Sequence, residues 1–398
     1  MKKELNKNNV MVNKNILFYI ALGIYLIATI IDSSFFCRLF PDVLVKISMF
    51  ITAFLIIIKE LTTSKISYKE LVYLIVCMIL TILTLYHMNH ITILPLFFLI
   101  YGARNIELDE VLKFIQYLTL TLLLIIIASA KLGIIQNYIT YGADRVREYL
   151  GFRYALFPQM YIFNISAISL YRHRKEISIP NILMLTALNY IIYQYTASRL
   201  SFYLYIILLV GYILLNIKRI FRLVSNGKVI KRILIISYIL AAGISIYVTT
   251  KYDPTNYKLN EINTILEGRL YLGKNAINNY GIKLLGNKVY FHGNGLGRDG
   301  TKSSNHYDYV DSLYLVMTIR YGLIFLIIYL AIHTVALINI SKKNEIFLLF
   351  ILSVIALHGI IDDLELELYY NSFWFAIGNN IILKRKKVLG CDMDENQN

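Results

Sequence analysis

Five arginine residues lie in or beside the hydrophilic stretches of the chain, where their charge is available to a ligand. They are Arg145, Arg147, Arg153, Arg199 and Arg269. A guanidinium group stays charged at any relevant pH, and its fork of N–H donors matches two phosphate oxygens at once. A single arginine at the end of an apolar segment is better explained by contact with lipid headgroups. Together, the five predict a site for an anionic ligand, for which a diphosphate is the natural candidate.

A second group of reactive side chains precedes a long apolar run. The group consists of His292, His306, Asp308 and Asp311. The spacing matches no metal-ligand pattern, so we expect no metal. A general base needs only one carboxylate that faces a bound hydroxyl, and Asp311, where the apolar run begins, suits that role. Asp311 also suits the N-cap of the helix that follows, and both roles are compatible.

The three other residues of this group, His292, His306 and Asp308, are further candidates for substrate contacts in the same loop. A phosphate-binding loop of the type G-x-x-x-x-G-K-[ST] is missing from the chain. The glycine cluster between Gly293 and Gly300 is more typical of a flexible turn. We therefore expect no nucleotide and no cofactor.

These side chains must be positioned by membrane-embedded elements, because composition excludes an ordinary soluble protein. Hydrophobic residues make up 57% of the 398 positions and charged residues 16%, which is more apolar surface than one water-facing globule can bury. The first apolar run lacks a small-x-small cleavage pattern, so we interpret it as a retained helix. Runs near the roughly 20 residues that cross a bilayer lie at 16–33, 42–58, 70–87, 89–102, 112–131, 154–171, 181–198, 200–217, 233–249, 312–340, 345–361 and 369–383.

The sequence thus predicts an all-α, polytopic integral membrane protein, a single domain over residues 1–398 with about 12 transmembrane helices. With the N-terminus inside, most of the 40 Lys and Arg residues fall on cytoplasmic connections. An even number of spans makes both termini cytoplasmic. Residues 250–311 then form one large extracytoplasmic loop, and residues 132–153 a smaller one. The net charge of +15 follows from this bias and from attraction to membrane lipids, so nucleic acid is not expected as a partner.

The order of these features resembles the bacterial O-antigen and capsular polysaccharide polymerases, which are related to the O-antigen ligases. The segments that carry the resemblance are RVREYLGF (145–152), TASRLSFYLYIILLV (196–210), GRLYLGKNAINNYGIKLLGN (268–287), FHGNGLG (291–297) and DSLYLVMTIRYGLIF (311–325). In the related ligases a histidine and an asparagine stand eleven residues before a glycine. Here Asp311 and Ser312 stand at those places before Gly322, which argues against ligase activity.

The resemblance implies a polymerase in the bacterial cytoplasmic (inner) membrane that joins two oligosaccharides, each linked to undecaprenyl diphosphate. The growing chain would be the donor and the incoming repeat unit the acceptor. It further implies a chain-length regulator and a flippase as partners. In this interpretation the leaving diphosphate is stabilised by Arg145, Arg147, Arg199 and Arg269, with Arg153 as a further candidate. Asp311 is the base or orients the acceptor hydroxyl.

Two other classes of protein remain open. A flippase for lipid-linked oligosaccharides, or another transporter, would show repeated halves and charged or broken helices near the midplane, whereas this chain shows Lys46 in the second run and no obvious repeat. A membrane acyltransferase acting on surface sugars would need His292, His306 or His358 as a base. His358 is equally explained as a buried, hydrogen-bonded residue.

Overall fold

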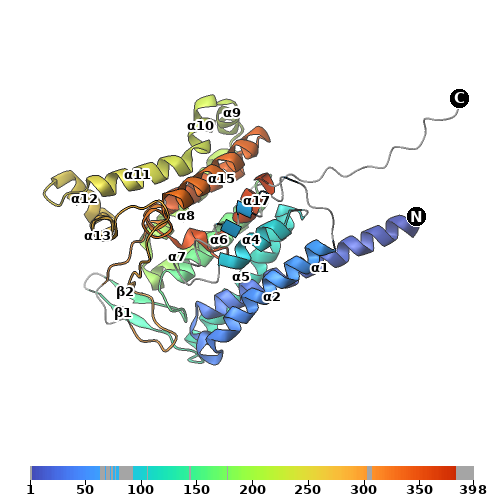
Figure 1. Cartoon of the computed structure of the whole chain (residues 1–398), viewed down its shortest axis with the longest axis horizontal. Helices are drawn as coiled ribbons and strands as arrows, with labels where there is room; N and C mark the ends of the chain where they lie inside the picture. Colours follow the sequence, from blue (N-terminus) through green and yellow to red (C-terminus); the bar gives the residue numbers. More distant parts are fainter. Residues whose placement is uncertain are drawn as a thin grey trace.

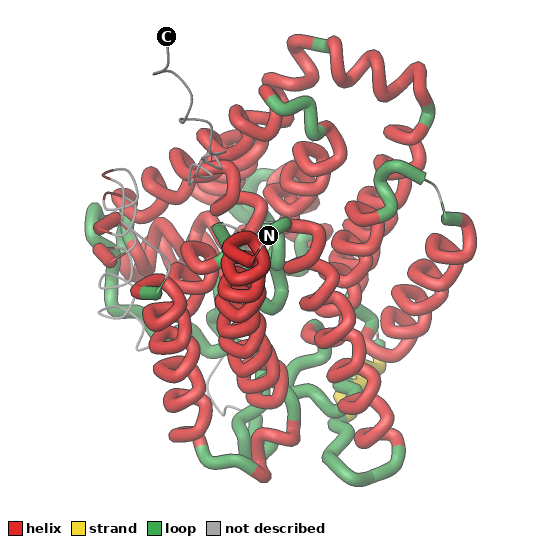
Figure 2. The backbone as a smooth tube through the Cα atoms, turned by 90° about the vertical axis from the view of Figure 1, so that its right-hand side faces the viewer, coloured by secondary structure: helices red, strands yellow, loops and turns green. Residues whose placement is uncertain are grey.

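Helices form most of the chain, and one two-stranded hairpin is the only sheet among the residues that the structure describes (Figure 2). The computed structural model describes residues 2–62, 68, 72, 75, 76, 78, 79, 93–104, 106–142, 145–176, 178–302 and 307–381, with the backbone alone for residues 2–14. The sequence prediction of a mostly helical chain is therefore confirmed.

The first half of the chain contains α1 (Lys2–Asp32), η1 (Phe35–Leu39), α2 (Asp42–Leu61), α4 (Ile93–Gly102), α5 (Leu108–Lys131), β1 (Ile139–Tyr141), β2 (Val146–Glu148), α6 (Phe157–Arg172) and α7 (Ile179–Thr196). The second half contains α8 (Arg199–Asn216), α9 (Lys218–Asn226), α10 (Lys228–Ile235), α11 (Ser237–Lys251), α12 (Tyr257–Ile265), α13 (Arg269–Tyr280), α14 (Leu313–Val316), the π-helical turn η2 (Met317–Tyr321), α15 (Leu323–Lys342), α16 (Ile346–His358), η3 (Leu364–Leu366) and α17 (Trp374–Ile381). Figure 1 shows that the β1–β2 hairpin and α12–α13 lie at one end of the helical bundle, and α9–α10 at another.

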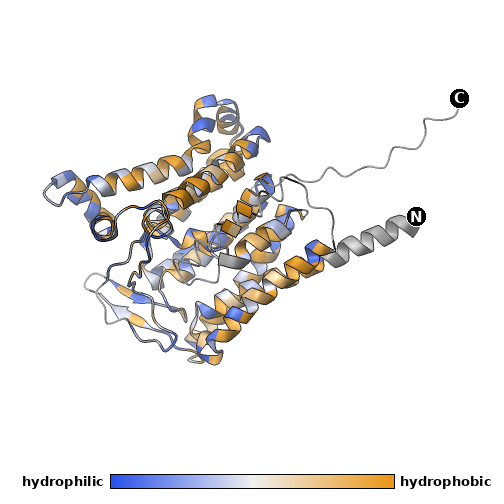
Figure 3. Ribbon diagram, in the orientation of Figure 1, coloured by the Kyte–Doolittle hydropathy of each residue, from blue (hydrophilic) through white to orange (hydrophobic). Residues whose placement is uncertain are grey.

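Four helical segments are long and apolar enough to cross a membrane, or five if the bent pair α10–α11 is one span. The four are Asn15–Asp32, Leu108–Lys131, Arg199–Asn216 and Leu323–Lys342. The prediction of about twelve such helices is wrong for the residues described. Figure 3 shows the apolar residues along these helices and hydrophilic residues gathered at the ends of the bundle.

The overcount arose because apolar runs do not reveal where a helix breaks. Helices α4, α6, α16 and α17 have 10, 16, 13 and 8 residues, fewer than the roughly 20 that a bilayer requires. Helix α2 is long enough but carries Asp42, Lys46, Lys59 and Glu60. The run 233–249 begins at a 59° bend between α10 and α11. The predicted span 70–87 lies largely outside the described residues.

Helix α6 forms the centre of the bundle. Its residues from Pro158 to Tyr171 are buried on all sides, as expected for a helix surrounded by others, and it packs against α5, α7, α8 and α16. Amide and hydroxyl side chains join it to its neighbours: Asn189 Nδ2 donates to Ser166 Oγ at 2.8 Å, and Asn164 Nδ2 to Ser372 Oγ at 2.9 Å. These bonds fix how α6 is rotated against α7 and the segment before α17.

That segment, residues 359–373, is the main departure from a simple bundle. It joins α16 to α17 and enters the core although it is mostly irregular, with Leu368 and Phe373 fully buried. Buried backbone groups need hydrogen-bond partners. The carbonyl of Glu365 accepts from Trp374 Nε1 at 3.0 Å, and the carbonyl of Gly359 accepts from the amide of Leu313 at 2.9 Å.

The predicted loops also contain regular structure. Residues 250–311 include α12 and α13, and residues 132–153 include the antiparallel β1–β2 hairpin, in which Thr140 pairs with Arg147. The run 312–340, predicted as one helix, breaks at Gly322 after the π-helical turn. The break leaves Arg320 in the short π-helical turn, while Asp311 lies in non-helical backbone before α14.

Two glycines fasten the large loop to this break. Gly286 and Gly322 have φ of +83° and +94°, in the region that favours glycine. A Cβ on Gly286 would collide with the carbonyl of Arg320, and one on Gly322 with the backbone of Gly286 and Leu284. The contact is completed by a hydrogen bond from the amide of Asn287 to the carbonyl of Arg320, at 3.1 Å.

We predict that Gly322→Ala lowers the free energy of unfolding by more than about 1–3 kcal/mol, since the substitution combines a strained φ with a backbone collision. Gly243→Ala is the control, because Gly243 is exposed in α11 and a Cβ there meets nothing, so stability should stay equal or rise by up to about 1 kcal/mol. Thermal unfolding in detergent measures both. Equal melting temperatures for the two variants would contradict the close contact.

Candidate functional site

Three of the predicted arginines converge at the end of the bundle that carries the hairpin. Arg145 and Arg147 are held on the turn between α7 and α8: Arg145 Nη1 donates to the carbonyl of Ala197 at 3.2 Å, and Arg147 Nε to the carbonyl of Thr196 at 3.0 Å. Carbonyls at a helix C-terminus lack partners within the helix, so cations are favourable there. The hairpin thereby acquires a fixed position against α7.

The third arginine, Arg269, is brought in by a sharp turn between α12 and α13. Glu267 and Gly268 have φ of +53° and +86°, and for glutamate this left-handed conformation is strained. The turn places the Glu267 carboxylate between two guanidinium groups, 3.0 Å from Arg145 Nη2 and 3.9 Å from Arg269 Nη1. One carboxylate therefore links the hairpin to α13.

Asp311 completes this group, which we call the arginine cluster: Arg145, Arg147, Glu267, Arg269 and Asp311. Arg269 Nε lies 3.4 Å from Asp311 Oδ2, and the hydroxyl of Tyr307 donates to the same oxygen at 3.1 Å. The N-cap residue of α14 is Ser312, whose hydroxyl lies 2.7 Å from that of Ser245. Asp311 is thus directed toward the arginines and Tyr307 instead of capping the helix.

Burial and charge act in opposite directions on the two carboxylates. Burial raises the pKa of Asp311, although the charge of Arg269 and the Tyr307 hydrogen bond oppose the rise. Burial also acts to raise the pKa of Glu267, but the hydrogen bond and charge of Arg145, together with the charge of Arg269, bring it below its ordinary value. Asp311 is therefore the better proton acceptor, and Glu267 the firmer counter-ion.

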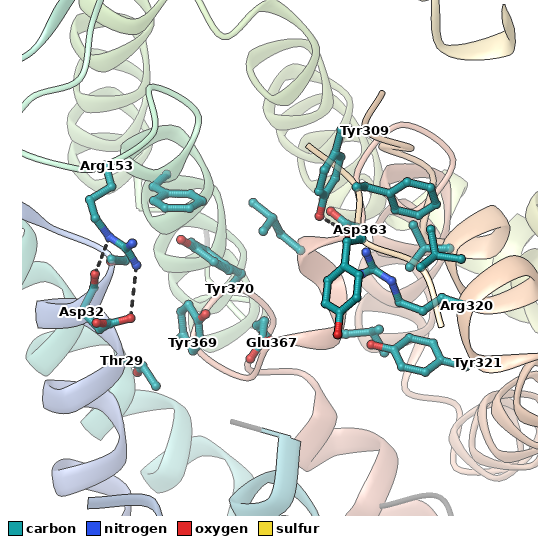
Figure 4. A pocket seen from close by; sticks show the side chains of 18 of the residues that line it. Thr29, Asp32, Arg153, Tyr309, Arg320, Tyr321, Asp363, Glu367, Tyr369 and Tyr370 are labelled. Carbon is teal, nitrogen blue, oxygen red and sulfur yellow. Dashed lines mark hydrogen bonds and ion pairs between the residues drawn. The ribbon is translucent and has the colours of Figure 1, made fainter. Parts of the chain in front are cut away.

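The described part of the chain also holds a cavity of about 400 Å³, whose lining residues are drawn in Figure 4. Its lining is rich in hydroxyl and carboxylate groups from Tyr309, Tyr321, Asp363, Glu367, Tyr369 and Tyr370. Most of these residues come from the irregular segment 359–373 and from the break at η2. A regular helix pairs its backbone N–H and C=O groups with one another, whereas a non-helical segment inside a bundle leaves polar groups open toward the space beside it. The break in the helix and the cavity therefore have the same origin.

One wall of the cavity contains Asp363 and Arg320. The hydroxyl of Tyr309 donates to Asp363 Oδ2 at 2.6 Å, and the Arg320 guanidinium lies over the ring of Phe291, 4.8 Å from its centroid. Burial raises the pKa of Asp363 to about 8, and the negative charge of Asp362 adds to the rise. Burial likewise raises the pKa of Asp362, to about 6. Near neutral pH, Asp363 therefore holds a proton.

The arginine cluster and the cavity meet at residues 361–363. Arg269 Nε donates to the carbonyl of Ile361 at 3.1 Å. The charge of Asp311 raises the pKa of the next residue, Asp362, and the charge of Arg269 lowers it. Asp363 lines the cavity. The backbone of residues 361–363 therefore links the arginine cluster to the wall of the cavity.

Arg153 does not join the other predicted arginines. Its Nη2 lies 3.1 Å from Asp32 Oδ2, on the side of the cavity that faces Tyr309 and Asp363 in Figure 4. Asp32 also pairs with Arg298, whose Nη1 lies 2.7 Å from Asp42 Oδ1. These pairs tie the ends of α1 and α2 to the large loop, so the structure gives Arg153 a role in that junction and in the cavity wall.

The remaining candidates lie apart. Arg199 is exposed at the first residue of α8, and its side chain makes no hydrogen bond or ion pair within the described part of the chain. His292 pairs with Asp308, with 3.3 Å between Nδ1 and Oδ1, but neither lines the cavity. His306 lies outside the described residues.

Sequence reasoning missed the cavity wall that contains Asp363 and Arg320, although one signal pointed to it. Arg320 interrupts an apolar run, and ionisable residues in such runs commonly mark functional sites. The acidic run from Asp362 to Glu367 separates two apolar segments, a pattern that is typical of an ordinary exposed loop. Only the fold shows that it is buried and that Asp363 and Glu367 face a cavity.

Chemically, the site combines donors for an anion with acceptors for hydroxyl groups. Three guanidinium groups exceed the two carboxylates of the arginine cluster by one positive charge. Within the described residues, no group of three or more His, Cys, Asp or Glu side chains is arranged to hold a metal ion. Comparison with protein-family models, curated proteins and solved structures gives no match for this chain.

The raised pKa of Asp363 predicts how stability depends on pH. The folded state binds this proton near pH 8, whereas an unfolded aspartate releases it near pH 4. The free energy of unfolding should therefore rise as the pH falls from 9 to 6, by up to about 1.4 kcal/mol per pH unit below the folded pKa. Asp363→Asn should flatten this slope in thermal unfolding. Glu261→Gln, at an exposed position of α12, should leave it unchanged, and equal slopes in all three proteins would contradict the buried acid.

Proposed function

We propose that this chain polymerises a surface polysaccharide, such as an O-antigen, capsule or exopolysaccharide. It would transfer the growing glycan from undecaprenyl diphosphate to an incoming lipid-linked repeat unit. The observation that carries the proposal is the convergence of Arg145, Arg147 and Arg269 around Glu267 and Asp311. The adjoining cavity of about 400 Å³, lined by tyrosines and carboxylates, suits the hydroxyl groups of a sugar.

In the proposed reaction, a hydroxyl oxygen of the acceptor attacks the anomeric carbon of the donor. The new C–O bond forms as the bond from that carbon to the diphosphate oxygen breaks, and its electron pair leaves with the lipid diphosphate. The hydroxyl proton passes to the Asp311 carboxylate, whose raised pKa favours acceptance. Fixed guanidinium groups stabilise the charge that grows on the diphosphate. The sugar diphosphate bond supplies the energy, so no nucleotide enters the step.

Glu267 and Arg199 have distinct parts in this proposal. Glu267 orients Arg145 and Arg269 before substrate binds, at the cost of competing with the diphosphate for their donors. Arg199 is exposed at the beginning of α8, one of the helices long enough to cross a membrane. Its charge is therefore available to a headgroup that approaches along the bilayer surface.

The proposal places the chain as a multi-pass protein in the bacterial cytoplasmic membrane. The arginine cluster would face the outer leaflet. The basic helices α9 and α10, away from the hairpin end of the bundle (Figure 1), would face the cytoplasm together with both termini, in keeping with the positive-inside bias. Of the three histidines that the acyltransferase alternative would need as a base, His358 is fully buried, lies 2.6 Å from Glu365 and is not among the residues lining the cavity.

Arg269→Ala should stop polymerisation in cells that make no other copy of the protein. Arg269 bonds or pairs with Ile361, Glu267 and Asp311, so its loss removes both a phosphate donor and the tie between the cluster and the cavity. We expect single lipid-linked repeat units to accumulate on the outer face, with normal protein levels. Polymer length on gels and extracted lipid-linked sugars measure this.

Lys288→Ala is the matched control, since Lys288 is an exposed basic residue of the same loop, and it should leave polymer length unchanged. Repeat units trapped on the cytoplasmic face would instead indicate a flippase. Normal chain length with lost acetyl groups would indicate an acyltransferase. Either result would refute the polymerase.

Two variants of the arginine cluster should affect diphosphate binding and glycan transfer differently. Arg147→Ala removes a charged donor and should weaken binding of an isoprenyl diphosphate by roughly 10-fold to 100-fold, since hydrogen bonds to charged groups contribute about 1.5–3 kcal/mol. Asp311→Asn removes a nearby negative charge, so it should bind the diphosphate at least as tightly as the wild type and still fail to transfer. Isothermal titration and a glycan-transfer assay on the purified protein measure the two effects. Undiminished transfer by Asp311→Asn would show that the carboxylate is not the proposed base.

A further inference from the structure

Helices α9 and α10 are both amphipathic, and their basic and apolar residues lie on opposite faces. In α9, Lys218, Arg219 and Arg222 share one face, while Ile220 and Leu223 belong to the other. Helix α10 repeats the pattern with its own lysines and arginine opposite isoleucine, valine and leucine. Such short helices, basic on one side and apolar on the other, are typical of segments that lie in the plane of a membrane interface.

The apolar faces of this pair are partly uncovered, at three residues. Leu223, Val229 and Ile233 are 59%, 67% and 51% exposed. In water, large apolar side chains grouped on so short a segment would be costly, whereas they are stabilised if they enter the acyl region of a bilayer. Their exposure therefore indicates that the pair rests on lipid.

A second cavity, of about 490 Å³, lies where α9 meets α6, α8 and the α15–α16 turn. Four basic residues line it, Arg174, Lys175, Lys218 and Arg222, against a single acidic residue, Glu345. Arg174 is engaged by Asp109 through two contacts of 3.0 Å. The other three are exposed and make no side-chain ion pair among the described residues.

The cavity also has an apolar part and a fixed rim. Phe221 and Phe347 line it, with ring centroids 6.1 Å apart. The rim is held by Asn344, whose Oδ1 accepts from Ser225 Oγ at 2.9 Å and from Lys231 Nζ at 3.0 Å. Basic side chains above an aromatic floor match a molecule with an anionic head and an apolar body.

We propose that this cavity binds the phosphate headgroup of an anionic phospholipid from the leaflet in which α9 and α10 lie. Lys175, Lys218 and Arg222 contact the phosphate, and the first carbons of an acyl chain lie against Phe221 and Phe347. The lipid joins α9 to the α15–α16 turn and so stabilises that end of the bundle. The site is separate from the arginine cluster, and its occupancy does not depend on the proposed polymerase reaction.

The test compares the full-length protein in detergent with Lys218→Gln/Arg222→Gln. Phosphatidylglycerol should raise the melting temperature of the wild type, while phosphatidylcholine with the same acyl chains should not. Each charge removed should weaken phosphatidylglycerol binding roughly fivefold, since a basic residue near an anionic surface contributes about 1 kcal/mol. The double variant should therefore need about 30-fold more lipid for the same shift.

The matched control is Lys258→Gln/Lys288→Gln, which removes two exposed charges from the large loop and should keep the wild-type response. Equal stabilisation by both lipids, or an undiminished response in the Lys218→Gln/Arg222→Gln protein, would overturn the proposal. So would an equal shift with inorganic phosphate alone, because that would make the cavity a site for a soluble anion. Native mass spectrometry, with co-purified phosphatidylglycerol retained by the wild type and lost by the Lys218→Gln/Arg222→Gln protein, gives a second measurement.

Discussion

One guanidinium group joins separate segments of the chain at the hairpin end of the molecule. Arg269 donates to the carbonyls of Leu266 and Ile361 and lies 3.4 Å from the Asp311 carboxylate. It thereby joins α13, the residues before α14 and the residues after α16, which are far apart in the chain. Charged hydrogen bonds of this kind are stronger and more directional than neutral ones. It therefore links the arginine cluster to the backbone of residues 361–363, next to a residue that lines the cavity.

The second constraint is the burial of an irregular segment. Residues 359–373 lie within the bundle and carry carboxylates there, which is stable only where each polar group finds a partner. Asp363 accepts from Tyr309, and Glu365 pairs with His358. The cavity exists because this segment does not fill its space as a helix would. Stability and site are linked at Asp363 and Glu367, the two acidic residues of this segment that line the cavity.

The sequence predicted the helical class and the candidate spans in α1, α5, α8 and α15. It could do so because apolar periodicity and charge asymmetry are local properties. The number of spans was wrong, because short buried helices such as α16 are as apolar as a span. Arg153 was grouped with the wrong partners, since its attraction to Asp32 crosses more than a hundred residues. The role of Asp363 depends on burial, which no local pattern reveals.

The close packing of Gly286 against Gly322 has a mechanical consequence. The loop and the π-helical turn touch backbone to backbone, and hydrogen bonds link Asn287 to Arg320 and Lys283 to Leu323. No side chain lies between them that could change rotamer and absorb a shift. A movement of the large loop must then be transmitted directly to the turn, carrying the Arg320 side chain along the cavity wall. A substrate that draws the loop toward the bilayer would in this way also reposition a charge inside the site.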